Sequence, residues 1–251
     1  MEKNNIIKPG KIISCTMEEN RLTAVCEKGN IQIIPYADNV IQFIYTPIGG
    51  DGEIVSPMWG IEARPDSNVH VSFIKDNLET YFGISGIRTV LHENGSVSFN
   101  DASGRELLTL LDYSLEPDVV LGESIYHIRA EFSASEDERY FGLGQHQDGK
   151  LNLGKREQIL WHDYSHKGGE IVAVPFMVTN KRYGIVFDNP SRMKVTPGIE
   201  GHTAWQAEVG EEISFFLITG KETNDIYKGF RLLTGVTPLP PRKGLGFIQC
   251  K

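Results

Sequence analysis

Short runs of alternating apolar and polar residues dominate the chain and predict β-strands. Residues 30–47 hold two β-branched and aromatic runs that are separated by Ala37-Asp38-Asn39, which predicts a hairpin. Residues 88–101 predict another hairpin around Asn94-Gly95, because both residues tolerate the positive φ of a type I′ turn. Further strands are expected within residues 70–85, 126–134, 173–180, 182–189, 192–198 and 211–220. The pattern therefore predicts an all-β fold, a large antiparallel β-sandwich.

One segment near the C-terminus breaks this pattern and predicts a short helix. Ile226, Phe230 and Leu233 follow the i, i+4, i+7 spacing of a single apolar stripe. Thr223 or Asn224 is a suitable N-cap, and Gly235 stands where a left-handed residue ends a helix. The prolines that follow cannot continue the helix.

The last residues predict the beginning of another structural unit. Leu245, Phe247 and Ile248 are apolar on both faces of an extended segment, as in a buried parallel strand. Such a strand has no parallel partner elsewhere in the sequence. We therefore expect a truncated chain, with one β-sandwich domain over residues 1–236 and an entry into a missing second domain over residues 237–251.

Composition and charge narrow the classes of protein. The 251 residues are 40% hydrophobic and 23% charged, which is typical of a globular protein. A net charge of −8 without Lys/Arg clusters argues against nucleic-acid binding. No apolar run reaches the length of a membrane span, and the N-terminus lacks a signal-peptide core, which leaves cytoplasmic and periplasmic locations open. Cys15, Cys26 and Cys250 are expected to be buried free thiols, since they form no C-x-x-C pair.

Polar and aromatic residues gather in residues 140–164, which end in Trp161-His162-Asp163-Tyr164. His162 and His166 have the i, i+4 spacing of a metal pair, but such a pair needs a helix that the nearby aromatics and glycines disfavour. Gly142 and Gly144 lack the third glycine and the following helix of a nucleotide loop. Asp163 between aromatic side chains suits sugar hydroxyls, although a solvated loop explains the same composition. No metal or cofactor is expected.

Five motifs in order give the chain a resemblance to a known family. These are residues 140–145 (YFGLGQ), 151–153 (LNL), 161–163 (WHD), 174–176 (VPF) and 183–185 (YGI) with Asn189. They resemble the N-terminal domain of glycoside hydrolase family 31, which includes α-glucosidases and α-xylosidases. The ending PLPPRKGLGFIQCK resembles the family's entry into its catalytic barrel.

The resemblance implies a galactose-mutarotase-like sandwich in front of a (β/α)₈ barrel, with residues 237–251 as the linker and first barrel strand. Both catalytic aspartates of the family lie in the barrel, so this chain is expected to contain no catalytic residue and to be inactive alone. One sandwich loop of the family leans over the barrel mouth and binds substrate. By resemblance Asp163 accepts hydrogen bonds from sugar hydroxyls, and His162 stands where an arginine is frequent. Trp161 completes the expected substrate-binding set.

The family resemblance implies a substrate-shaping domain of a retaining α-glycosidase that acts on oligosaccharides. Its partners would be the oligosaccharide and the missing barrel of the same chain, with any homo-oligomer formed through the full-length enzyme. A stand-alone carbohydrate-binding module is the alternative, which the unpaired C-terminal strand disfavours. A mutarotase-like epimerase would need a histidine facing a carboxylate, for which His127, His146 and Glu131 are available. No spacing selects among them, and the preference for glucose or xylose stays open.

Overall fold

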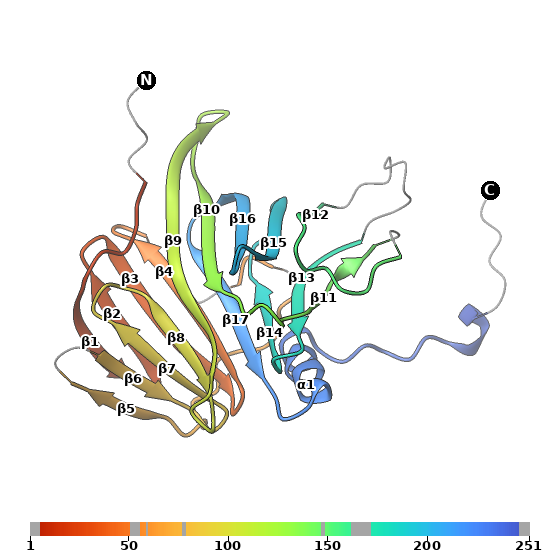
Figure 1. The fold of residues 1–251 in the computed structure, drawn as a ribbon, viewed down its shortest axis with the longest axis horizontal. Helices are drawn as coiled ribbons and strands as arrows, with labels where there is room; N and C mark the ends of the chain where they lie inside the picture. The colour runs from red at the N-terminus through yellow and green to blue at the C-terminus, as the bar shows by residue number, and fades with distance from the viewer. Residues whose placement is uncertain are drawn as a thin grey trace.

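Two antiparallel sheets pack face to face in the computed structural model, which describes residues 6–50, 56–58, 60–76, 79–146, 149–161 and 172–245 (Figure 1). The eight-stranded sheet has the spatial order β1 (Ile12–Glu18), β2 (Arg21–Cys26), β3 (Gly29–Ala37), β4 (Val40–Pro47), β17 (Ile213–Thr219), β14 (Tyr183–Phe187), β13 (Val172–Thr179) and β11 (Tyr140–Gln145). The nine-stranded sheet has the order β12 (Gln158–Leu160), β15 (Met193–Ile199), β16 (His202–Gly210), β10 (Glu123–Ser133), β9 (Glu106–Val120), β8 (Val97–Asp101), β7 (Ile87–His92), β6 (Glu79–Gly83) and β5 (Ser72–Lys75). The predicted all-β sandwich is confirmed.

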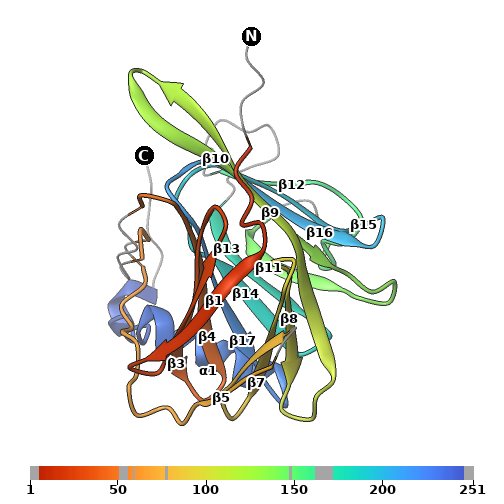
Figure 2. The ribbon, with the colours of Figure 1, turned by 90° about the vertical axis from the view of Figure 1, so that its left-hand side faces the viewer.

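The main core fills the space between the two sheets with side chains from alternate strand positions. Phe215 of β17 stacks on Phe43 of β4, with ring centroids 4.9 Å apart, and meets Phe132 of β10 edge to face at 5.2 Å. All three rings are buried. Each such ring contributes roughly 1.5–3 kcal/mol through the removal of apolar surface from water. Figure 2 shows the two layers from the side, with β9 and β10 extending beyond the rest of the sandwich.

Helix α1 (Thr223–Thr234) covers the outer face of the eight-stranded sheet, where it closes a second core (Figure 1). Ile226 and Leu233 of the predicted stripe are fully buried, and Phe230 stacks on Phe176 at 4.1 Å. The N-cap is Glu222 rather than the expected Thr223 or Asn224. Its backbone N–H donates to Asp225 Oδ2 at 3.1 Å, so an acidic side chain one turn into the helix takes over the capping role.

Local hydrogen bonds decided the type of turn in one predicted hairpin. The predicted hairpin at Asn94-Gly95 forms, but only Gly95 of this pair has a positive φ, so the turn is not type I′. Asn94 Oδ1 instead accepts hydrogen bonds from the backbone and hydroxyl of Ser96.

Cys15 and Cys26 are buried free thiols as predicted, whereas Cys250 lies outside the described residues.

The described part of the chain ends in a turn of 3₁₀ helix, Arg242–Leu245. The N–H of Gly244 donates to the carbonyl of Pro241 at 2.8 Å, which holds this turn closed. Leu245 therefore ends a helical turn and not the extended strand that its apolar character predicted. Phe247 and Ile248 lie outside the described residues. The division at residue 236 stays a prediction.

Candidate functional site

The first part of residues 140–164 is structural. Tyr140 and Leu143 of β11 are almost completely buried, and so is Leu153 in the following turn. The hydroxyl of Tyr140 accepts a hydrogen bond from Thr203 Oγ1 at 3.2 Å, which ties β11 to the opposite sheet. Two of the six residues in the motif of residues 140–145 thus pack into the core.

The two glycines of this motif produce an irregularity in the pairing of β11 with β13. Gly142 and Gly144 have φ values of +100° and +102°, and the register shifts between them. A Cβ atom at Gly144 would lie 1.8 Å from the carbonyl oxygen of Val172, so only glycine allows this approach of the two backbones. Gln145 consequently pairs with Val172, where β13 begins.

Trp161 directly follows β12, the edge strand of the nine-stranded sheet, and its side chain is 52% exposed. It borders a cavity of about 530 Å³ at the edge of the sandwich. Much of the lining is apolar, and includes Pro57, Met58, Pro175 and Met193. A half-exposed indole beside such a cavity offers the flat apolar surface on which a sugar ring packs.

The other two predicted substrate-binding residues, His162 and Asp163, lie outside the described residues. The described chain leaves β12 at Trp161 and resumes at Val172 of β13. The roles of His162 and Asp163 therefore stay predictions. Of the sequence-predicted set, the structure locates Trp161 and places it at a cavity.

A polar turn forms part of the cavity wall; its Asn189 was named among the family motifs but was not predicted to belong to the site. Asn189 Oδ1 accepts hydrogen bonds from the backbone and hydroxyl of Ser191, and its amide donates to the carbonyl of Val209 at 2.8 Å. Both the oxygen and the nitrogen of the Asn189 side-chain amide thus take part in holding the turn. The signal was present in the sequence, since the polar run from Asp188 to Ser191 follows a buried strand.

Asp188 anchors another segment that lines the same cavity. Its carboxylate accepts hydrogen bonds from Ser56 and from Ser214 Oγ, the latter at 3.1 Å. Ser56 Oγ in turn accepts the N–H of Met58, a cavity residue, at 3.1 Å. Burial raises the pKa of Asp188 above its ordinary value, although the two hydroxyl donors oppose this shift. The carboxylate thereby fixes the residues Ser56-Pro57-Met58 against the sandwich.

A second carboxyl group, Glu212, lies in the electrostatic field of Asp188. Burial raises the pKa of Glu212 to about 7, and the charge of Asp188 adds to this shift. Thr46 Oγ1 donates a hydrogen bond to Glu212 at 3.4 Å and opposes it. A raised carboxyl pKa means that the folded chain binds a proton that the unfolded chain has released.

Stability is therefore expected to fall as the pH rises from about 4.5 to about 7, and to stay low above that range. Glu212→Gln removes this titration, so the variant should lose less stability over that range and unfold at a higher temperature than the wild type above pH 7. Thermal melts at a series of pH values measure this. Glu106→Gln, which changes an exposed carboxylate at the start of β9, is the control. An unchanged pH profile in Glu212→Gln contradicts the assignment.

The residues considered for epimerase chemistry do not form a facing pair. His127 and Glu131 both lie on β10, four residues and thus about 13 Å apart along the strand. Both ring nitrogens of His127 are engaged, by Asp118 Oδ2 at 3.0 Å and by the carbonyl of Glu208 at 2.6 Å. His146 follows β11, which belongs to the other sheet. His127 therefore has no free nitrogen for use as a general base.

Within the described ranges, no three side chains of His, Cys, Asp or Glu are grouped so that they could hold a metal ion. The same residues include no helix with the length and apolarity needed to cross a bilayer.

Comparisons with known proteins agree with this architecture. A family model described as the glycosyl hydrolase 31 N-terminal galactose mutarotase-like domain matches residues 30–195. An α-xylosidase from Saccharolobus solfataricus is 29% identical over 237 residues, covering 88% of this chain and 30% of the relative. The chain thus spans less than a third of that relative's length.

Two solved structures share the fold. A glycoside hydrolase family 31 dextranase variant from Flavobacterium johnsoniae, complexed with isomaltotriose, superposes with a TM-score of 0.78 at 18% identity, covering 96% of this chain and 30% of that one. An α-xylosidase of the same family from a soil metagenome, complexed with xylose, gives 0.75 at 23% identity, covering 91% and 35%. At these identities the likeness concerns the fold.

Proposed function

The chain belongs to the glycosyl hydrolase 31 N-terminal galactose mutarotase-like domain family, and from this we propose that it shapes the substrate site of a retaining α-glycosidase. The parent enzyme would be an α-glucosidase or α-xylosidase that acts on oligosaccharides. The family match carries the proposal, together with an α-xylosidase relative of which the chain covers only 30%. The dextranase and α-xylosidase of similar fold, which were crystallised with isomaltotriose and xylose, support the same substrate class.

The role of the sandwich in this proposal is to supply one wall of the sugar site. Trp161, exposed beside a largely apolar cavity, would pack against a sugar ring. Asp163, two residues further along, would accept charge-assisted hydrogen bonds from sugar hydroxyls. His162 would contribute hydrogen bonds, but without the permanent charge and planar fork of an arginine. Asp188 and Asn189 hold the cavity walls in place, so their role would be to position the residues that line the cavity.

The hydrolytic step would be carried out by residues beyond position 251. Retaining glycosidases use two carboxyl groups about 5–5.5 Å apart, one as nucleophile and one as acid/base. The resemblance assigns both to the barrel, so the present chain would contribute specificity and no catalysis. A carbohydrate-binding module is the competing proposal, and it differs in expecting tight sugar binding by the isolated chain.

Asp163→Asn in the longer protein tests the proposal. We expect kcat/KM for aryl α-glucosides or α-xylosides to fall roughly ten- to hundredfold, because a hydrogen bond to a charged group contributes about 1.5–3 kcal/mol. The melting temperature should stay unchanged, since a loop carboxylate does not support the core. Steady-state kinetics and thermal melts measure the two effects. In the same assay, the 251-residue chain alone should release no product.

Asp137→Asn is a matched control, because it makes the same chemical change at an exposed carboxylate that pairs with Lys181. It should leave kcat/KM unchanged. A lower melting temperature with intact kinetics in Asp163→Asn would make that residue structural and would refute its assignment to the site.

A further inference from the structure

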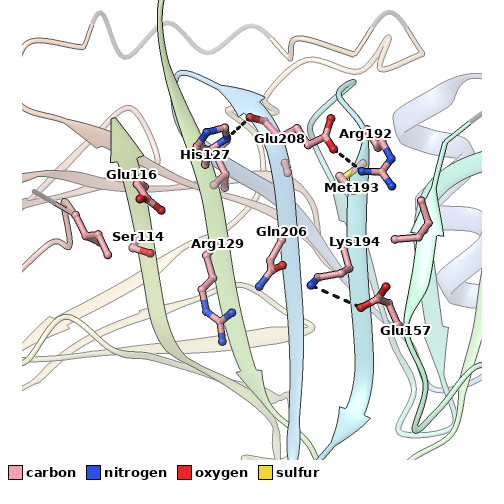
Figure 3. A pocket seen from close by; sticks show the side chains of 14 residues that line it. Ser114, Glu116, His127, Arg129, Glu157, Arg192, Met193, Lys194, Gln206 and Glu208 are labelled. Carbon is pink, nitrogen blue, oxygen red and sulfur yellow. Dashed lines mark hydrogen bonds and ion pairs between the residues drawn. The ribbon is translucent and has the colours of Figure 1, made fainter. Parts of the chain in front are cut away.

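A second cleft of about 570 Å³ lies on the outer face of the nine-stranded sheet, over β9, β10, β16 and β15 (Figure 3). Its volume is within the range of small-molecule sites. Strand alternation produces it, because Ile128 and Trp205 point into the core while their neighbours Arg129 and Gln206 point outward. The cleft is thus built on regular strands, which hold side chains more precisely than loops do.

A continuous row of polar residues crosses the floor of this cleft. Ser114 is the register partner of Arg129, Arg129 is the partner of Gln206, and Gln206 is the partner of Lys194. The row therefore spans four adjacent strands, a length of about 14 Å at the usual strand spacing of about 4.8 Å. It presents a hydroxyl, a guanidinium, an amide and an ammonium group in sequence.

A second row runs beside the first, with Glu116 on β9, His127 on β10, Glu208 on β16 and Arg192 directly before β15. His127 Nδ1 donates to the carbonyl of Glu208 at 2.6 Å, and the carboxylate of Glu208 pairs with Arg192 (Figure 3). A hydrogen bond to Asp118 raises the pKa of His127 above its ordinary value. These contacts lock most of the second row in place before any ligand binds.

Three side chains of the two rows retain unused hydrogen-bonding capacity. Ser114, Glu116 and Gln206 line the cleft, and within the described residues their side chains make no hydrogen bond. Figure 3 shows Gln206 between Arg129 and Lys194 without an interaction to either. A hydroxyl, a carboxylate and an amide together match the donor and acceptor groups of a polyhydroxylated ligand.

Apart from His127, which pairs with Asp118, the charges that line the cleft are balanced. The acids Glu116, Glu157 and Glu208 oppose three bases, which are Arg129, Arg192 and Lys194. Lys194 and Glu157 form a pair at 3.6 Å, and Arg129 pairs with Glu131 outside the cleft. A balanced surface offers no net field for a phosphate group or a polyanion, and therefore favours a neutral ligand.

We propose that this cleft is a second saccharide-binding site, which takes a neutral oligosaccharide of a few rings along the row from Ser114 to Lys194. It is separate from the Trp161 cavity, although Met193 borders both. The described lining includes no aromatic side chain, so affinity rests on hydrogen bonds and on contacts with Ile159 and Met193. A millimolar dissociation constant is therefore expected.

The test is a titration of the 251-residue chain, which contains all four strands of the row, with maltose and with isoprimeverose, followed by backbone amide NMR. We expect the amides of Ser114, Arg129, Gln206 and Lys194 to shift together with a single Kd. Gln206→Met and Ser114→Ala, which keep side-chain volume nearly constant, should each raise this Kd roughly two- to tenfold for one lost hydrogen bond. Ser124→Ala, on an exposed position of β10 outside the cleft, should leave it unchanged.

Trp161→Ala separates this site from the proposed substrate cavity. The shifts along the row should persist in that variant, and their loss would refute a separate site. The proposal is overturned if the amide chemical shifts of the residues in the row do not change at tens of millimolar of either sugar. Equal shifts with glycerol or with inorganic phosphate would do the same, because they would show a site without preference for saccharides. A negative result in this titration would leave the kinetic test of Asp163 unaffected.

Discussion

Replacement of Trp205 by alanine is expected to lower the free energy of unfolding by about 3–5 kcal/mol. The indole is completely buried on β16 and stacks on Phe187 of β14, with ring centroids 5.1 Å apart and planes inclined by 5°. The contact joins the two sheets, so its removal leaves a cavity between layers that cannot readily collapse. Chemical denaturation and calorimetry measure the effect, with a melting temperature roughly 6–20 °C lower.

Two further variants identify the origin of this loss. Trp161→Ala makes the same chemical change at a 52% exposed position and should have a much smaller effect on unfolding. Trp205→Phe keeps an aromatic ring against Phe187 and removes an indole N–H that has no hydrogen-bond partner among the described residues. Its effect should be less than half that of Trp205→Ala. Equal losses for the alanine variants at positions 161 and 205 would contradict the packing argument.

Gly144→Ala is expected to destabilise the chain by about 3 kcal/mol or more. The positive φ of +102° is unfavourable for an L-residue, and the added Cβ would collide with the backbone of Val172 and Val174. Main-chain atoms cannot rotate away as a side chain can, so β11 must separate from β13 at this point. Hydrogen exchange at Gln145, which pairs with Val172, should accelerate more than exchange in α1.

Gly122→Ala provides the matched control, at the tip of the hairpin between β9 and β10. Its φ is +89°, but no atom lies within 4 Å of the position that a Cβ would occupy. This variant experiences only the conformational penalty, about 1–2 kcal/mol. Comparable destabilisation of the two variants would show that backbone strain, and not the close approach of β13, accounts for the glycine at position 144.

Local periodicity predicted much of the fold correctly. The hairpin of β3 and β4, the paired strands β7 and β8, and the stripe of Ile226 and Leu233 in α1 all follow from side-chain direction within one element. The longest strand, β9, was not predicted, although it spans Glu106–Val120. Its beginning, ELLTLLDYSL, has the apolar spacing of a helix as well as that of a strand, and only pairing with β8 and β10 decides between them.

The candidate site was predicted less completely, for a different reason. Trp161 was selected because an aromatic residue beside an acidic one suits a sugar, and the structure places it at a cavity. Asp188 and Glu212 were not predicted to interact, since they lie 24 positions apart in the sequence. Their coupling arises because β14 and β17 are neighbours in the eight-stranded sheet. Gly142 and Gly144 were only judged unfit for a nucleotide loop, and the structure shows that they allow the close approach of two strands.

The sequence by itself determined which side chains turn inward, because alternation along a strand is a local property of the backbone. Family membership likewise follows from residues 30–195 in order. Only the tertiary structure decided which strands become neighbours and in what register. Ser114, Arg129, Gln206 and Lys194 form one row although they are spread over more than 90 positions of the chain. Register results from the summed packing of two whole sheets, and no local pattern contains that information.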